Sequence, residues 1–139
     1  MTIYLLDTNT VSYILKGKSA AARARLERVG TRKDQDAAIS TVTVAEILYG
    51  LEKIGAALSR RKAIEVFFST ITICPWDQAA AEAFGQLRAR QESRGKPLGP
   101  YDFQIAAHAI ALGAVLVSHD RAFRHVTGLP GLEDWATDL

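Results

Sequence analysis

Short apolar segments alternate with longer amphipathic ones along this chain, and the first apolar segment is the most constraining. Residues 3–6 read Ile-Tyr-Leu-Leu and run directly into Asp7. An unbroken apolar run of this length is typical of a strand buried on both faces, as in a parallel sheet. In open α/β sheets, ligands bind outside the carboxyl ends of the strands. The pattern therefore places Asp7 at a candidate active edge, although capping of the following helix explains an aspartate there equally well.

The rest of the chain repeats this alternation. Further strands are predicted at residues 37–40, 70–74 and 114–118, separated by helices at 10–15, 20–29, 43–54, 59–68, 77–91 and 100–112. The motif Thr43-Val44-Ala45-Glu46 has the form of a capping box and is expected to open its helix. After residue 120 we expect a short helix and a tail that contains Trp135. The alternation predicts an α/β fold, a three-layer α/β/α sandwich with a short, mostly parallel sheet.

Composition narrows the class of protein. The chain has 139 residues, 48% of them hydrophobic and 23% charged, which suits one globular domain over residues 1–139. Its longest apolar run, residues 109–117, is far shorter than the roughly 18 residues of a membrane span. No signal peptide is visible, and the single cysteine, Cys74, cannot form an intrachain disulfide. We therefore expect a cytoplasmic protein with no membrane partner.

The net charge of +2 hides a basic segment. Residues 16–33 carry seven basic side chains against one acid, Glu27, and smaller basic groups occur at 60–62 and 88–96. Such stretches bind phosphate backbones, but solvated helix faces have the same composition. The charge pattern leaves both interpretations open.

Four acids are distinguished by their position. Asp7 and Asp120 each follow a predicted strand, whereas Glu46 and Asp102 each lie in the predicted opening turn of a helix. In a parallel α/β sheet these positions lie along one edge, so we expect all four to face one crevice. Each also has a local explanation, as a helix cap, as part of a capping box or as a partner of a helix dipole. The local explanations give no reason for four acids to share an edge.

Four like charges in one crevice require protonation or a neutralising cation. Oxygen-only ligands favour a hard ion such as Mg²⁺ or Mn²⁺. If basic stretches flank the crevice, the substrate should be polyanionic, which suggests hydrolysis of nucleic-acid phosphodiester bonds. This hypothesis requires that the four carboxylates lie within reach of one common ion.

The order and context of these acids resemble a PIN domain, and the small size and C-terminal residues resemble VapC-type toxins of bacterial toxin–antitoxin pairs. The motifs that carry the resemblance are Asp7-Thr8-Asn9, Glu46 within residues 43–47, Asp102 before residues 105–107, Ser118-His119-Asp120 before Phe123, and Gly131-Leu132 with Trp135. The resemblance covers nearly the whole chain. It implies an α/β/α sandwich with Mg²⁺- or Mn²⁺-dependent ribonuclease activity on RNA. It also implies a homodimer and a cognate antitoxin whose tail occupies the acidic groove.

The same resemblance implies roles for individual residues. Asp7, Glu46, Asp102 and Asp120 would be the acidic metal-site residues, with Asp120 acting directly or through a water. Asn9 would be the polar partner that orients Asp7.

Other interpretations stay open. A degenerate PIN domain that only binds a partner would keep the same acids, and a haloacid-dehalogenase-like phosphatase also places an acid after its first strand. That phosphatase motif needs a second aspartate where this chain has Asn9. Among the remaining residues, His108 is expected to be a core or interface histidine, His119 a neighbour of the site, and Tyr101 the best candidate for stacking on a base.

Overall fold

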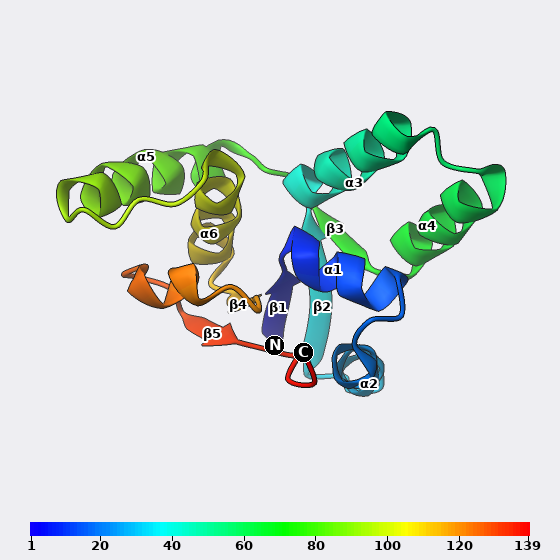
Figure 1. Cartoon of the computed structure of the whole chain (residues 1–139). Coiled ribbons are helices and arrows are strands. Elements are labelled where there is room, and N and C mark those ends of the chain that lie inside the picture. The colour runs from blue at the N-terminus through cyan, green and yellow to red at the C-terminus, as the bar shows by residue number, and fades with distance from the viewer.

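The computed structural model describes residues 1–139 and contains one five-stranded sheet with the order β3-β2-β1-β4-β5 (Figure 1). The central strand β1 (Thr2–Leu6) pairs with β2 (Gln35–Ser40) and with β4 (Val115–Val117). The edge strands are β3 (Thr72–Cys74) and β5 (Gly131–Glu133). All four pairings are parallel, so the sheet predicted to be mostly parallel is parallel throughout.

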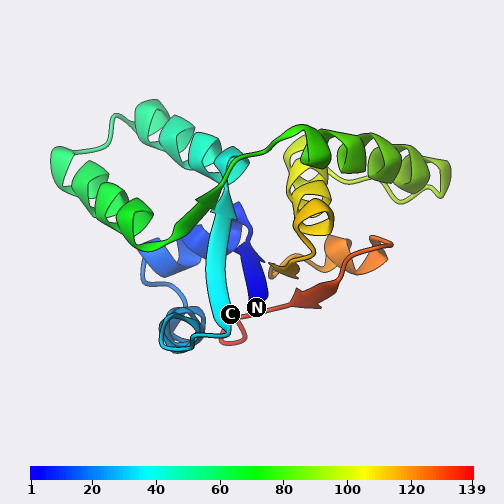
Figure 2. The same ribbon diagram turned by 180° about the vertical axis from the view of Figure 1, so that it is seen from behind.

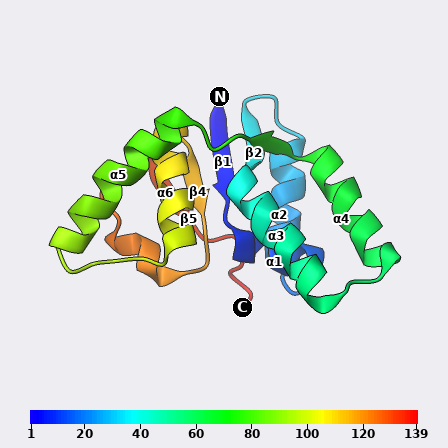
Figure 3. The same cartoon turned by 90° about the horizontal axis from the view of Figure 1, so that it is seen from above.

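Helices cover both faces of this sheet, and two helical pairs diverge from its upper edge (Figures 1 and 2). Seen from above, the α3–α4 pair and the α5–α6 pair lie on opposite sides of β1 (Figure 3). The helical segments are α1 (Thr8–Leu15), α2 (Ala20–Gly30), α3 (Thr41–Ile54), α4 (Leu58–Thr70), α5 (Gln78–Ser93), α6 (Pro100–Leu112) and the 3-10 helix η1 (Arg121–His125). None of these helices is both long and apolar enough to cross a membrane.

Two separate hydrophobic clusters form the core, one on each face of the sheet. Side chains alternate along a strand, so Leu5 packs in one cluster with Phe103 of α6, whereas Leu6 packs in the other with Val11 of α1 and with Trp135. Burial on both faces explains why the first strand is apolar without interruption. The predicted three-layer arrangement is confirmed.

The start of α3 differs from the prediction. The helix begins at Thr41, and the buried Ser40 caps it by accepting a hydrogen bond from the Val42 amide at 3.0 Å. Thr43 therefore lies inside the helix, and the predicted capping box is wrong. A serine at the end of β2 took the capping role because the strand runs into the helix without a loop. Glu46 consequently lies in the second turn of α3.

Two strands also differ from the prediction. The strand expected at residues 70–74 begins at Thr72, because α4 continues through Thr70. The edge strand β5 was not predicted, since it contains a glycine, a single large apolar residue and a glutamate. Gly131 fits there because its backbone lies against Val115 of β4, and an added Cβ would be 3.1 Å from Val115 Cγ2.

Gly131→Ala is expected to lower the free energy of unfolding by about 1 kcal/mol, because its Cβ crowds Val115. The matched control Gly85→Ala lies in α5, where an added Cβ meets nothing within 4 Å. That control should raise the free energy of unfolding by about 0.5–1 kcal/mol. Urea unfolding followed by circular dichroism measures both values. Equal stabilities for the two variants would contradict the close packing of β5 on β4.

Candidate metal centre

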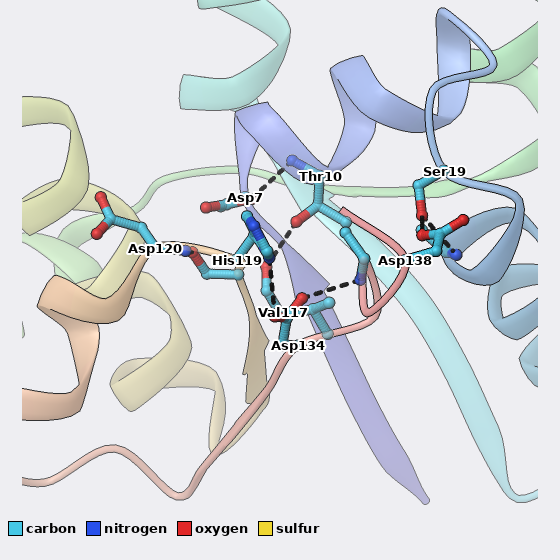
Figure 4. Close-up of polar contacts among 11 residues, drawn as sticks. Asp7, Thr10, Ser19, Val117, His119, Asp120, Asp134 and Asp138 are labelled. Carbon is cyan, nitrogen blue, oxygen red and sulfur yellow. Dashed lines mark hydrogen bonds and ion pairs between the residues drawn. The ribbon is translucent and has the colours of Figure 1, made fainter.

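The carboxyl ends of β1 and β4 bring the first two acids to one edge of the sheet. Leu6 and Val117 are partners in the parallel register, and the Asp7 amide donates to the Val117 carbonyl at 3.0 Å. Asp7 follows β1 directly, and Asp120 lies just beyond the end of β4. In Figure 4, both carboxylates extend to the same side of the view. The two acids therefore lie at the same edge of the sheet, where the sequence placed them.

A threonine ties the third acid to this edge. Thr8, the first residue of α1, donates a hydrogen bond from its hydroxyl to Glu46 Oε1 at 2.6 Å. Its hydroxyl also lies 3.1 Å from that of Thr43 on α3. Thr8 thus holds Glu46 beside the residue that follows β1. The sequence motif Asp7-Thr8-Asn9 included Thr8 but predicted no role for it, although its small polar side chain directly after Asp7 was the available signal.

The fourth acid, Asp102, lies in the first turn of α6 as predicted. Its pKa is raised from the ordinary value of 3.8 to about 6, first by burial and then by the charges of Asp120, Asp7 and Glu46. A carboxylate feels three others in this way only when they share its surroundings. The structure therefore gathers all four acids at one edge, and their mutual repulsion is present without any ligand.

Asp7 is the most buried of the four, with 3% of its surface exposed. Burial raises its pKa, the charge of Asp120 raises it slightly further, and hydrogen bonding with Ser118 and Thr10 works in the opposite direction. All five ion pairs of the structure involve other acids, so no lysine, arginine or histidine neutralises any of the four. A buried carboxylate without a counter-charge is costly, and a bound cation would remove that cost.

The carboxylates do not form a closed ligand set as they stand. Asp7 Oδ1 accepts from the Thr10 amide at 2.9 Å, and Asp120 Oδ1 accepts from the Ala122 amide at 2.9 Å, so both act as helix caps. No three acidic, histidine or cysteine side chains are placed to hold one ion together. In these side-chain conformations, the four carboxylates are therefore not all within reach of one common ion. The donor set still suits Mg²⁺ or Mn²⁺, because it consists only of carboxylate oxygens.

Residues around the four acids are placed as follows. Asn9, implied as the residue that orients Asp7, is exposed on α1, and the amide that binds Asp7 belongs to Thr10. His119 turns its Nδ1 to Asp134 Oδ2 at 2.8 Å, a contact drawn as a dashed line in Figure 4. Tyr101, next to Asp102, is 56% exposed, which leaves its ring accessible to a ligand.

A groove of the molecule begins at this edge. It has a volume of about 310 Å³ and lies between α1, α3 and α4; we call it the α1–α3–α4 groove. Thr8 and Glu46 belong to its lining, as do Gly50, Leu51 and Ile54 farther along α3. The groove therefore connects an acidic site residue with an apolar surface.

Comparison with known proteins identifies the family. The family model of the PIN domain matches residues 4–129. The chain belongs to the PIN domain family.

Relatives with assigned activities cover almost the whole chain. The tRNA(fMet)-specific endonuclease VapC of Shigella flexneri is 37% identical over 98% of this chain and all of the relative. Ribonuclease VapC2 of Haemophilus influenzae is 35% identical over 97% of this chain and 99% of the relative.

Solved structures agree with these sequence matches. VapBC2 from Rickettsia felis, bound to a DNA fragment from its promoter, superposes with a TM-score of 0.89 at 30% identity. That match covers 96% of this chain and 99% of the other. DNA-bound VapBC from Salmonella typhimurium has a TM-score of 0.83 at 35% identity, with 97% and 99% of the two chains covered. The resemblance noted from the sequence is confirmed.

Asp102→Asn is expected to raise the free energy of unfolding of the metal-free protein by about 1 kcal/mol at pH 7, a value discounted for the half-exposed side chain. The folded-state pKa lies above the ordinary one, so ionisation of Asp102 opposes folding. In the wild type this penalty is absent below pH 3.8 and grows as the pH rises to about 6. The stability difference between the two proteins should follow the same course.

Urea unfolding in EDTA, repeated across this pH range, measures that difference. The matched control is Glu65→Gln on α4, an exposed acid outside every ion pair. Its stability should not diverge from the wild type in the same pH range. A lower stability of Asp102→Asn at pH 7 would contradict the mutual repulsion of the four acids.

Proposed function

We propose that this chain is a metal-dependent endoribonuclease and the toxin of a type II toxin–antitoxin pair. The observation that carries the proposal is the group of four acids without counter-charge, three of which raise the pKa of Asp102. The named activities of the VapC relatives support the same conclusion. Cys74, which is unpaired, and an RNA substrate both suit the cytoplasm.

Asp7, Asp102 and Glu46 would hold Mg²⁺ or Mn²⁺, directly or through water, with Asp120 completing the site. When bound, such an ion activates a water and offsets charge on a phosphoryl group. Asp7 and Asp120 each use one carboxylate oxygen, Oδ1, as a helix cap. A carboxylate accepts several hydrogen bonds or ligands, so capping by one oxygen is compatible with coordination by the other.

The chain's own residues would prepare this site in three ways. Thr8 holds Glu46 by its 2.6 Å hydrogen bond, so that the carboxylate does not have to be ordered when the substrate binds. Asp102 must be ionised to bind a cation, and its raised pKa makes that ionisation depend on pH near 6. Asn9 and Tyr101 are exposed beside Asp7 and Asp102, where they would contact the RNA.

Basic side chains would receive the phosphate backbone. Arg121 and Arg124 of η1 are exposed, lie in no ion pair and line a small cavity of about 110 Å³ that also includes Asp120. Free guanidinium groups beside an acidic metal site attract an anionic substrate without neutralising the carboxylates. Transfer RNA is the first substrate to test, because a relative that is 37% identical is named for it.

Two protein partners belong to this proposal. A cognate antitoxin would place its tail in the α1–α3–α4 groove, where Glu46 offers a negative charge and Ile54 an exposed apolar surface. A second copy of the chain would form a homodimer. The exposed apolar residues of α3 and α4, which include Leu48, Leu58 and Val66, are candidates for that contact.

Purified protein is expected to cleave end-labelled transfer RNA with Mg²⁺ or Mn²⁺ and to be inactive in EDTA. Asp7→Asn keeps the shape and removes the charge, so it should lower the cleavage rate by about 100-fold or more. The exposed Glu65→Gln should cleave like the wild type. Cleavage that survives in Asp7→Asn would contradict the proposed site, and metal binding without cleavage of any RNA would favour a binding module.

Gly50→Leu is expected to weaken binding of the antitoxin by about tenfold or more, because the new side chain fills the groove. An added Cβ at Gly50 meets nothing within 4 Å, so the fold should tolerate the change. Gly85→Leu on α5, which is equally open, should bind normally. Isothermal titration with the antitoxin measures both affinities, and unchanged binding by Gly50→Leu would exclude the groove.

A further inference from the structure

A buried histidine that the proposed mechanism does not use lies on the helix that carries Asp102. His108 is on α6, six residues after Asp102, and only 1% of its surface is exposed. Its Nδ1 is 2.9 Å from the hydroxyl oxygen of Ser40, which is also buried. Burial lowers the pKa of His108, so the ring is neutral inside the protein.

The hydrogen-bond partners of Ser40 determine which ring nitrogen carries the proton. The Ser40 oxygen already accepts from the Val42 amide at 3.0 Å, as the N-cap of α3. The buried Ser40 hydroxyl still has its proton, and His108 Nδ1 is the other group within hydrogen-bond distance of its oxygen, so donation to Nδ1 gives that proton its acceptor. Nδ1 is then the acceptor, and the proton of the neutral ring is on Nε2. The Pro75 carbonyl provides an acceptor for a ring N–H on the same histidine.

This hydrogen bond joins the two helices that carry half of the acidic site. Ser40 caps α3, which carries Glu46 six residues later, and His108 is part of α6, which carries Asp102. The two bonded side chains are 68 residues apart in the sequence. A metal ion such as Mg²⁺ tolerates little error in ligand position, so the spacing between these helices matters to its affinity.

A purely structural role does not require a histidine here. An apolar side chain would fill the same space without the cost of desolvating an imidazole. The imidazole is the group in α6 that accepts the proton of the Ser40 hydroxyl, and without it that buried hydroxyl would lose its acceptor.

We propose that His108 is a positioning residue of the metal centre, because its hydrogen bond to Ser40 sets the spacing between Glu46 and Asp102. The proposal rests on the proposed metal-dependent function. It predicts that removing this hydrogen bond weakens metal binding more than a core substitution elsewhere that lowers the thermal stability by the same amount.

The test measures Mn²⁺ affinity of the full chain by electron paramagnetic resonance of the free ion. Ser40→Ala and His108→Leu should each weaken Mn²⁺ binding by about tenfold. The double variant should be no weaker than either single one, because both changes remove the same link. His108→Asn has the shape of the leucine variant but keeps an acceptor, so it should recover most of the affinity.

Ser19→Ala is the matched control. Ser19 is also a buried serine N-cap bonded to a distant side chain, since it accepts from the Ala22 amide and donates to Asp138. Its helix, α2, carries none of the four acids. Ser19→Ala should lose thermal stability as Ser40→Ala does and bind Mn²⁺ within about twofold of wild type.

Two outcomes would overturn the inference in different ways. If Ser40→Ala and His108→Leu melt at lower temperature but bind Mn²⁺ like the wild type, His108 is a core residue alone. If the wild type binds no more Mn²⁺ than Asp7→Asn, the metal centre itself is wrong and the positioning role falls with it. Nitrogen chemical shifts of the His108 ring provide a separate readout without metal. They should show Nδ1 unprotonated and Nε2 protonated, and a protonated Nδ1 would contradict the hydrogen bond from Ser40.

Discussion

The parallel pairing of β1 with both of its neighbours is the constraint on which the rest of the structure depends. Because β1, β2 and β4 run in the same direction, their carboxyl ends lie along one edge. Asp7 follows β1 and caps α1, and Ser40 ends β2 and caps α3, so both helices start at this edge. The same pairing requires both faces of β1 to be covered, and two separate core clusters provide that cover. The parallel pairing of β1 therefore determines both the packing of the core and the geometry of the site.

The four acids at this edge lower the stability of the folded protein, and no ion pair within the chain compensates for them. Burial raises the pKa of Asp7, and burial together with three other acids raises the pKa of Asp102. The remaining acids of the chain include several in ion pairs, but these four are in none. Unrelieved repulsion of this kind is typical of functional sites, where a ligand supplies the missing charge. The same repulsion that lowers the stability of the metal-free protein is thus the basis of the cation affinity proposed for this edge.

The sequence was sufficient for the elements with strong patterns and not for those set by tertiary contacts. An apolar run before Asp7 predicted the central strand, and Pro100 predicted the helix start that places Asp102. β5 has no such pattern, because an edge strand of three residues needs little apolar surface. Thr43 was predicted to cap α3, whereas the structure gives that role to Ser40 at the end of β2. The hydrogen bond from Ser40 to His108 joins distant segments, so no local sequence motif predicts it.

The most direct test of the central claim is the position of a bound ion. A crystal soaked in Mn²⁺ and measured at the manganese absorption edge would locate it by anomalous scattering. We expect one strong peak in contact with Asp7 and Asp102, with Glu46 and Asp120 around it and the Asp7 side chain still at the end of β1. A peak held by other residues, or none at an Mn²⁺ concentration that supports RNA cleavage, would contradict the claim that these four acids form the metal centre.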